Sequence, residues 1–576
     1  MSNTALPETP TAPSVLPGAD DAVAHTLLNC LLREVSGPES QSAVSGDHLL
    51  LRLPRRDVLL RIRIRRTSRI GAHRFLGPVE HRHSGQWTPV DWQTLARYAH
   101  DELTLHNGVA NDEFLTQIAS SHATLTTTLG SVPDVGDLDY LASERSLIFG
   151  HRFHPTPKAR TGSPEQWARY SPETGAGFGL RMLAVRTHLV AEESNDQAAS
   201  TALDDLGPIV PVGYRLLPAH PWQYEMMCTR PAVQAALDRG DIVDLGVGTR
   251  QFAATASVRT VYDGTMFLKF SLNVRITNCL RKNAWYELTG AVTLDRILAP
   301  IFEQLHTRFP GSAMLREPAY RSLALPGTDG GPDRELLEGF GVIVREGLPG
   351  RLRPGVTALL AAAVADEYPT GPAHISRLLP DQHPDQALRW WDAYLDLLVA
   401  PILAAYFEFG VVLEPHLQNV LIGVDGAGLP VQVLFRDLEG TKLVADQHEA
   451  VLAALLPEVG QRMTYDAHRG WDRVVYCLFV NNIADMLAAL ADLHPALETV
   501  LWERVRDKVS GYSAQAGHPP RLAALLAGVP LPAKANLLTR WERKSDRDAG
   551  YVRLPSPLTS PPLSEYGTSA LAELTR

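Results

Sequence analysis

The feature that most constrains the fold is a stretch of alternating apolar and polar residues, Ser257–Arg281. Its even-numbered positions are mostly apolar, whereas its odd-numbered positions carry Arg259, Lys269 and Arg275. Alternation with a period of two is typical of β-strands that place one face against a core and leave the other face polar. The stretch therefore predicts a β-hairpin with positive charge on one face. That face either binds an anion or is an ordinary exposed polar face of a sheet.

The turn of this hairpin decides whether its cations share a face. A two-residue turn at Asp263-Gly264 would send Arg259 and Lys269 to opposite faces. We therefore expect a loop with an odd number of residues, or a β-bulge nearby. With such a loop, both cations face one cleft and Asp437 lines the opposite wall.

The charge of the whole chain restricts the kind of ligand that these cations serve. The formal net charge is −10, so the protein has no generally basic surface for nucleic acid. A local cluster of cations in an acidic protein favours a small anionic ligand. We expect no nucleic-acid partner.

Two further observations concern location. The longest apolar run, Leu397–Phe407, has 11 residues and contains a proline, which is too short for a membrane span. The four cysteines form no metal-binding or CxxC spacing, and the N-terminus has no apolar signal segment. We expect a cytoplasmic protein without a membrane partner. Helical and strand patterns are mixed along 576 residues, which predicts an α+β protein of about three to five structural units.

A second basic segment is "GHRFHPTPKARTG", from Gly150 to Gly162. It carries His154, Lys158 and Arg160 with no acid, and its two prolines exclude a regular helix. Such a rigid loop can hold phosphate or carboxylate groups, and the alternative is an ordinary surface loop.

The acidic counterpart is "EPHLQNVLIGVDGAGLPVQVLFRDLEG", which has the pattern of strand, glycine-rich turn and strand. Glu414, His416 and Gln418 would share one strand face, and Asp437 and Glu439 would share one at the far end. Oxygen donors of this kind suit Mg²⁺, which also binds substrate phosphates. The alternative is a solvated hairpin with one core histidine. Together with the cations, the acids are consistent with a site for ATP, Mg²⁺ and an anionic substrate.

The ordered set of segments resembles the IucA/IucC family of siderophore synthetases, which make siderophores without a nonribosomal peptide synthetase. The set comprises "GHRFHPTPKARTG", "HPWQ", "SVRT", Lys269 followed by "ITNCLR", "EPHLQN" and "FRDLEG". It covers roughly residues 144–439. Each segment is weakly specific, whereas their common order is specific.

The resemblance implies a cupped-hand α+β fold with thumb, fingers and palm regions, usually as a homodimer. We expect a disordered tail over residues 1–20, a thumb-like region over 21–145, a β-rich fingers-like region over 146–385 and a mostly helical palm-like region over 386–576. It also implies two-step chemistry. A carboxylate substrate, which we expect to be citrate, attacks the α-phosphate of ATP to form an acyl-adenylate, and an amine or hydroxyl nucleophile then displaces AMP.

The resemblance also implies roles for individual residues. Nucleotide binding falls to His154, Lys158, Arg160, Ser257, Arg259, Thr260, Lys269 and Asn419. Binding of the carboxylate substrate falls to Thr277, Asn278, Arg281, His416 and Gln418. Catalysis falls to Arg281, His416 and Lys269, and Mg²⁺ binding to Glu414 and Asp437.

Two other functions remain open from the sequence. "HLQNVLI" followed by "FRDLEG" is loosely similar to the catalytic segments of phosphotransferases, although the expected Asp between His and Asn is missing. A non-catalytic siderophore-binding protein on the same fold is the third reading. The products distinguish them: AMP and pyrophosphate for a synthetase, ADP for a phosphotransferase, and no nucleotide turnover for a binding protein.

Overall fold

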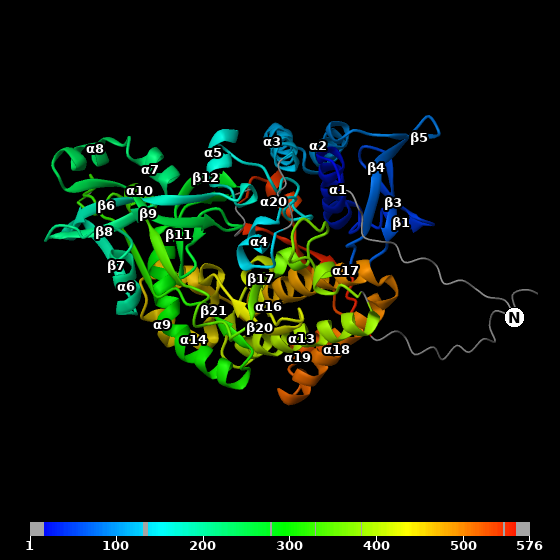
Figure 1. Cartoon of the computed structure of the whole chain (residues 1–576). Coiled ribbons are helices and arrows are strands. Elements are labelled where there is room, and N and C mark those ends of the chain that lie inside the picture. The colour runs from blue at the N-terminus through cyan, green and yellow to red at the C-terminus, as the bar shows by residue number, and fades with distance from the viewer. Residues whose placement is uncertain are drawn as a thin grey trace, which may run out of the picture.

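The computed structural model describes residues 16–130, 136–276, 279–328, 330–381, 383–544 and 548–559. Three large apolar cores organise these residues, and they lie in three parts of the molecule (Figure 1). The predicted division at residues 20, 145 and 385 stays a prediction.

The N-terminal part is a five-stranded antiparallel sheet packed against helices. Its elements are α1 (Ala19–Leu31), β1 (Ser42–Ser45), β2 (His48–Leu53), β3 (Val58–Arg66), β4 (Arg74–His83), β5 (Gln86–Pro89), α2 (Trp92–Asn107) and α3 (Asp112–Leu129). Helix α2 begins where the Asp91 side chain accepts a hydrogen bond from the Thr94 amide, and it ends at Gly108, whose φ is 72°. The C-terminal helix α20 (Asn536–Trp541) packs on the same core, with the rings of Trp541 and Phe114 5.6 Å apart.

The second part is an eight-stranded sheet in the order β7-β15-β16-β11-β10-β9-β6-β8, seen on the left of Figure 1. Its strands are β6 (Gly177–Arg186), β7 (Val190–Ser194), β8 (Tyr214–Ala219), β9 (Ile242–Ala254), β10 (Thr260–Tyr262), β11 (Met266–Phe270), β15 (Ala319–Leu323) and β16 (Val342–Glu346). The predicted hairpin is β10 and β11. Apolar cores pack on both faces of this hairpin, with Leu268 in one and Phe267 in the other. The face predicted to be polar is therefore buried as well, and Lys269 is only 1% exposed.

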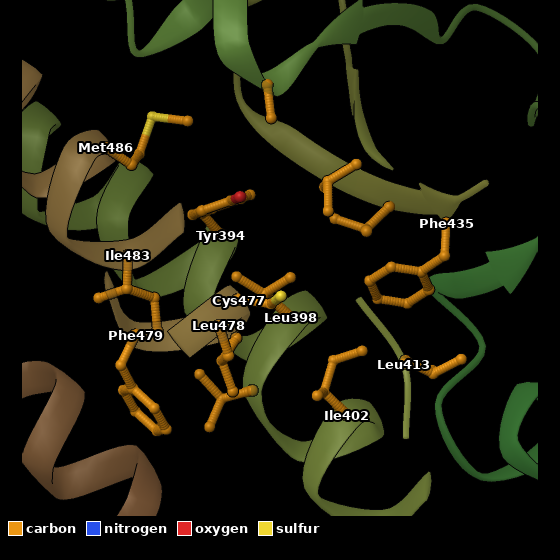
Figure 2. Close-up of a cluster of buried hydrophobic side chains, with 14 of the residues drawn as sticks. Tyr394, Leu398, Ile402, Leu413, Phe435, Cys477, Leu478, Phe479, Ile483 and Met486 are labelled. Atoms are coloured by element: carbon orange, nitrogen blue, oxygen red, sulfur yellow. The ribbon is translucent and has the colours of Figure 1, made fainter. Parts of the chain in front are cut away.

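The third part combines long buried helices with a four-stranded sheet in the order β14-β20-β19-β17. Its strands are β14 (Ser312–Met314), β17 (Thr357–Leu360), β19 (Val420–Val424) and β20 (Pro430–Phe435). Figure 2 shows the core, where α13 (Pro384–Phe407) meets β20 and the helical run Ala467–Leu493. That run is long and apolar enough for a membrane span, but 94% of its apolar window is buried inside the protein. Its apolar character is therefore accounted for by the core.

Three local predictions are wrong. The last pair of the β10–β11 ladder is Tyr262 with Phe267, so four residues, an even number, separate the two paired positions instead of the odd number expected. The segment from Glu414 to Gln418 is not a strand: it leads into a 3-10 turn (Leu417–Asn419), and β19 begins only at Val420. At the far end, Asp437 and Glu439 do not share a strand face either, because β20 ends at Phe435 and Glu439 lies in a 3-10 turn (Leu438–Gly440). The proline after Glu414 fixes φ and removes an amide donor, which disfavours a strand interior there.

Candidate active site

The predicted site residues gather around one cavity of about 790 Å³, which all three parts of the molecule line. The predicted residues in its wall are His154, Lys158, Arg160, Arg259, Arg281, Glu414, His416, Gln418, Asn419 and Asp437. Lys269 and Thr260 are buried directly behind this wall, opposite each other in the β10–β11 pair. Thr277 and Asn278 lie outside the described residues.

A compact cluster of opposite charges forms where the two sheets meet. The Lys269 ammonium lies 2.6 Å from the Asp437 carboxylate and 2.7 Å from that of Glu439. Arg259 donates to the same Glu439 carboxylate at 2.8 Å. The two cations thus converge on one acid, and Asp437 contacts Lys269 directly instead of facing it across a cleft.

The electrostatics of the cluster keep these groups charged. Burial by itself would raise the pKa of Glu439, but Lys269 and Arg259 outweigh that effect and lower it to about 2. The pKa of Asp437 is lowered too, because Lys269 and Arg345 outweigh its desolvation. Burial would lower the pKa of Lys269, yet the two carboxylates raise it above its ordinary value. Both carboxylates are therefore ionised at neutral pH.

Backbone strain explains how Arg259 reaches the cluster despite the even loop. Val258, which precedes it, has a φ of 66°, a conformation that is costly for a β-branched residue. Ser257 holds this turn, because its hydroxyl accepts a hydrogen bond from the Thr260 amide at 3.2 Å. Arg259 therefore lies outside β10, where strand alternation does not set its direction. Ser257 has a shaping role here that its sequence pattern did not reveal.

Two buried residues that the sequence analysis missed hold the cluster in place. Asn283 accepts a hydrogen bond from Arg259 at 2.6 Å and donates to the Lys269 carbonyl at 3.1 Å. Glu144 accepts from Arg436 at 2.6 Å and from the Ala256 amide at 2.8 Å, which fixes the start of the strained turn. In the sequence, Asn283 stands two residues after the segment "ITNCLR", and Glu144 stands at the start of the region that the motifs cover. No other sequence signal indicated these roles.

The basic loop from Gly150 is less free than its sequence suggests. Lys158 and Arg160 both contact the buried carboxylate of Glu173, at 2.5 Å and 2.6 Å. Burial would raise the pKa of Glu173, but these cations lower it to about 2. The loop thus presents cations that one acid partly neutralises. His154 accepts a hydrogen bond from the Thr156 amide at 3.2 Å and also lines the cavity.

The segment around His416 forms another part of the wall. Glu414 lies 3.4 Å from Arg473, and its carbonyl accepts a hydrogen bond from the Asn419 side chain at 3.2 Å. Burial lowers the pKa of His416, and the acids nearby only partly oppose this. The imidazole is therefore neutral at pH 7, with nitrogen available to accept a hydrogen bond. The Gln418 carbonyl accepts a hydrogen bond from Arg436 at 3.0 Å.

Asp437 and Glu439 are two acids of the cavity wall with the oxygen chemistry that Mg²⁺ requires. Their oxygens are hard and ionised, and Lys269 already neutralises part of their charge. Across the described residues, no group of three or more His, Cys, Asp or Glu side chains is arranged to hold a metal. The pair therefore suits an ion that takes its other ligands from water and phosphate. The role of Glu414 as a ligand stays a prediction.

Comparison with known proteins finds two matching family models and several similar proteins. Residues 139–366 match the family model described as "IucA / IucC family", and residues 388–549 match one described as "Ferric iron reductase FhuF-like transporter". The chain is 29% identical over 452 residues to the rhizobactin siderophore biosynthesis protein RhbC of Rhizobium meliloti (strain 1021), covering 73% of this chain and 76% of that protein. It is 28% identical over 494 residues to the L-2,3-diaminopropanoate--citrate ligase of Staphylococcus aureus (strain NCTC 8325 / PS 47), covering 81% and 82%.

Solved structures with the same fold are also known. The structure of ATP-bound aerobactin synthetase IucA from a hypervirulent pathotype of Klebsiella pneumoniae superposes with a TM-score of 0.81 at 24% identity. The match covers 94% of this chain and 100% of that one, and it confirms the predicted α+β synthetase fold. The ordered motifs, the family match over residues 139–366 and the fold agree, and they confirm the predicted resemblance to the IucA/IucC family.

Proposed function

We propose that this protein is an ATP-dependent ligase of siderophore biosynthesis that adenylates citrate and joins it to an amine or hydroxyl nucleophile. The observation that carries the proposal is the single cavity that Arg259, Arg281 and His416 line together with the carboxylates of Asp437 and Glu439. The relatives support the substrates, because one is a citrate ligase and a structural neighbour is ATP-bound.

The charges in the cavity are the ones that the reaction needs. ATP and citrate are both strongly anionic, so bringing them together requires opposed cations. Each attraction is worth roughly 1–4 kcal/mol at about 4 Å for effective dielectric constants of about 80 to 20. Arg281 would stabilise charge on the carboxylate and the α-phosphate, and the buried Lys269 and Arg259 would set the potential on the polyphosphate side.

In the first step a citrate carboxylate oxygen bonds to the α-phosphorus, and the bond to pyrophosphate breaks. In the second step the nucleophile bonds to the acyl carbon, the bond to AMP oxygen breaks, and the nucleophile loses a proton. His416, neutral at pH 7, is suited to orient the carboxylate and to accept a proton. Asp437 and Glu439 would hold Mg²⁺, which neutralises phosphate charge when bound. The chain needs no covalent nucleophile, because the substrate carboxylate is the attacking group.

A product assay tests the proposal. The protein is incubated with ATP, Mg²⁺ and a panel of carboxylates, with hydroxylamine as a surrogate amine. We expect release of AMP and pyrophosphate with citrate and little with acids that have one carboxylate. Formation of ADP would overturn the proposal in favour of a phosphotransferase, and no nucleotide turnover with any acid would favour a binding protein.

A further inference from the structure

Most cations in the cavity wall are already paired with a carboxylate of the chain. The paired cations are Arg152, Lys158, Arg160, Arg259, Lys282 and Arg473. Arg281, Lys442 and Arg462 also line the cavity, and none of them forms an ion pair with a carboxylate of the described residues. Arg281 already has a place in the proposed reaction. Lys442 and Arg462 have none, and their charge is available to an anionic ligand.

Lys442 lies directly beside the acids that suit Mg²⁺. Its ammonium group donates to the backbone carbonyl of Glu439 at 2.8 Å and to that of Thr441 at 3.2 Å. An ammonium group has three N–H donors, so one remains for a ligand. Burial lowers the pKa of Lys442 from its ordinary value, and Glu414 and Glu439 only partly oppose this. A phosphate group next to Lys442 would stabilise its charged form.

Arg462 presents its donors to the same cavity. It is an exposed residue of α15 (Pro457–Met463), and its guanidinium lies over the ring of Tyr286, 4.9 Å from the ring centre. The Tyr286 hydroxyl in turn donates a hydrogen bond to Glu287 at 3.1 Å. A guanidinium that lies over an aromatic ring keeps its in-plane N–H donors, which match the oxygens of a phosphate in pairs. Tyr286 therefore holds Arg462 at the wall with donors to spare.

Glu287 is an acid near both cations, and its charge is weakened. Its carboxylate acts on the pKa of Lys442, and it accepts the hydrogen bond from the tyrosine beneath Arg462. Burial and the nearby Glu439 raise the pKa of Glu287 to about 7. Glu287 is therefore partly protonated at neutral pH and opposes a bound anion only in part. We call Lys442, Arg462 and Tyr286 the free-cation cluster.

The place of the free-cation cluster identifies the anion. In nucleotide enzymes the metal ion bridges the β- and γ-phosphates, and the attacking and leaving oxygens lie roughly in line on opposite sides of the phosphorus. Glu439, whose carbonyl accepts the hydrogen bond from Lys442, is one of the two acids that suit this ion. The β- and γ-phosphates leave together as pyrophosphate. The cluster therefore suits the leaving group, and the attacking citrate belongs on the other side of the α-phosphorus.

We propose that Lys442 and Arg462 bind the pyrophosphate group, first as the β- and γ-phosphates of ATP and then as the leaving product. This rests on the proposed function of the cavity. When the bond between the α-phosphorus and the bridging oxygen breaks, its electron pair stays on that oxygen, so the pyrophosphate gains one negative charge. Cations without acid partners stabilise this developing charge. They also retain pyrophosphate after the reaction, which makes it a product inhibitor.

Direct binding tests the inference without turnover. Isothermal titration measures the affinity of the full chain for pyrophosphate in the presence of Mg²⁺, and for AMP and citrate as comparison anions. Lys442→Met and Arg462→Gln each remove one cation and should weaken pyrophosphate binding about tenfold, with little change for AMP or citrate. Lys442→Arg keeps the charge and should retain most of the affinity.

Matched controls separate the free cations from paired ones. Lys282→Met removes a cation of the same wall that is already paired with Glu338 at 2.7 Å. Arg334→Gln removes an exposed arginine that is paired with Glu458 of α15. Both variants should bind pyrophosphate with the affinity of the wild type, because neither removes a cation that is free to bind an anion.

Three results would overturn the inference. They are no binding of pyrophosphate by the wild type, an unchanged affinity in Arg462→Gln, and a loss of affinity for citrate in place of pyrophosphate. Arg462 is exposed, so its variant decides the test even if Lys442→Met does not fold.

The two proposals fail separately. Release of AMP and pyrophosphate with citrate and hydroxylamine, combined with an unchanged pyrophosphate affinity in Arg462→Gln, would overturn the inference and leave the proposed function standing. Formation of ADP, combined with a loss of pyrophosphate affinity in Arg462→Gln, would overturn the proposed function and leave the two cations as a pyrophosphate site.

Discussion

Replacing Lys269 by Met tests the buried charge cluster most sharply. Methionine is nearly as long and fills the same space, but it leaves Asp437 and Glu439 without their central cation. Removing one partner of a buried ion pair costs about 3–5 kcal/mol. The side chains of Asp437 and Glu439 are each 31% exposed, so water recovers part of this, and we expect a loss of about 2–3 kcal/mol.

Native-state hydrogen exchange of the β10–β11 amides measures this loss where it arises. A loss of about 2–3 kcal/mol corresponds to a decrease in protection of roughly 30- to 150-fold. Lys282→Met is the matched control, because Lys282 lies 2.7 Å from Glu338 but is 22% exposed. It should cost under about 1 kcal/mol. If Lys269→Met behaves like Lys282→Met, the argument from burial is wrong.

Three further predictions follow from other contacts. Burial lowers the pKa of His220 to about 3 and that of His151 to about 4, while unfolded histidine titrates near 6.5. The stability that these two neutral histidines contribute is therefore complete above pH 6.5 and is lost as the pH falls toward 4. Scanning calorimetry should show a melting temperature that falls over this range, and a constant melting temperature from pH 7 to 4.5 would contradict the prediction. Glu144→Ala leaves the buried Arg436 without its carboxylate partner and should lower the free energy of unfolding by about 3–5 kcal/mol. Glu144→Gln should lower it clearly less, as measured by thermal denaturation, and equal losses would rule out charge as the cause. Arg281→Ala should lower the rate of pyrophosphate release about 10²–10³-fold with an unchanged circular dichroism spectrum, and near-normal turnover would refute its assigned role.

The sequence predicted strands more successfully than it predicted their surroundings. The alternation after Ser257 indicated β10 and β11 because side chains in a strand alternate between two faces. It could not reveal that both faces are buried, one by the second part's own core and the other by the third part of the molecule. The length of the loop could not be predicted either, because the pair Asp263-Gly264 is compatible with a two-residue turn as well as with a longer loop.

The site was predictable as a set of residue types, and its pairing was not. The basic and acidic segments were recognised, but Glu173 lies outside them although it is only 13 residues from Arg160. Nothing in the sequence indicated that Arg259 pairs with Glu439, which is 180 residues away. Asn283 and Glu144 act through buried hydrogen bonds, which have no periodic pattern. One face of helix α1 also lines the cavity, because the N-terminal part packs beside the other two parts. This packing is decided by tertiary structure and has no sequence signal.

The central claim is that a citrate oxygen becomes bonded to the α-phosphorus of ATP, and isotope transfer tests it directly. Citrate labelled with ¹⁸O in its carboxylates is converted in the presence of ATP, Mg²⁺ and an amine, and the phosphorus-containing products are analysed by mass spectrometry. Attack on the α-phosphate, followed by cleavage of the acyl C–O bond, predicts one ¹⁸O atom in each AMP formed and none in pyrophosphate. Label in inorganic phosphate, accompanied by ADP, would contradict the account.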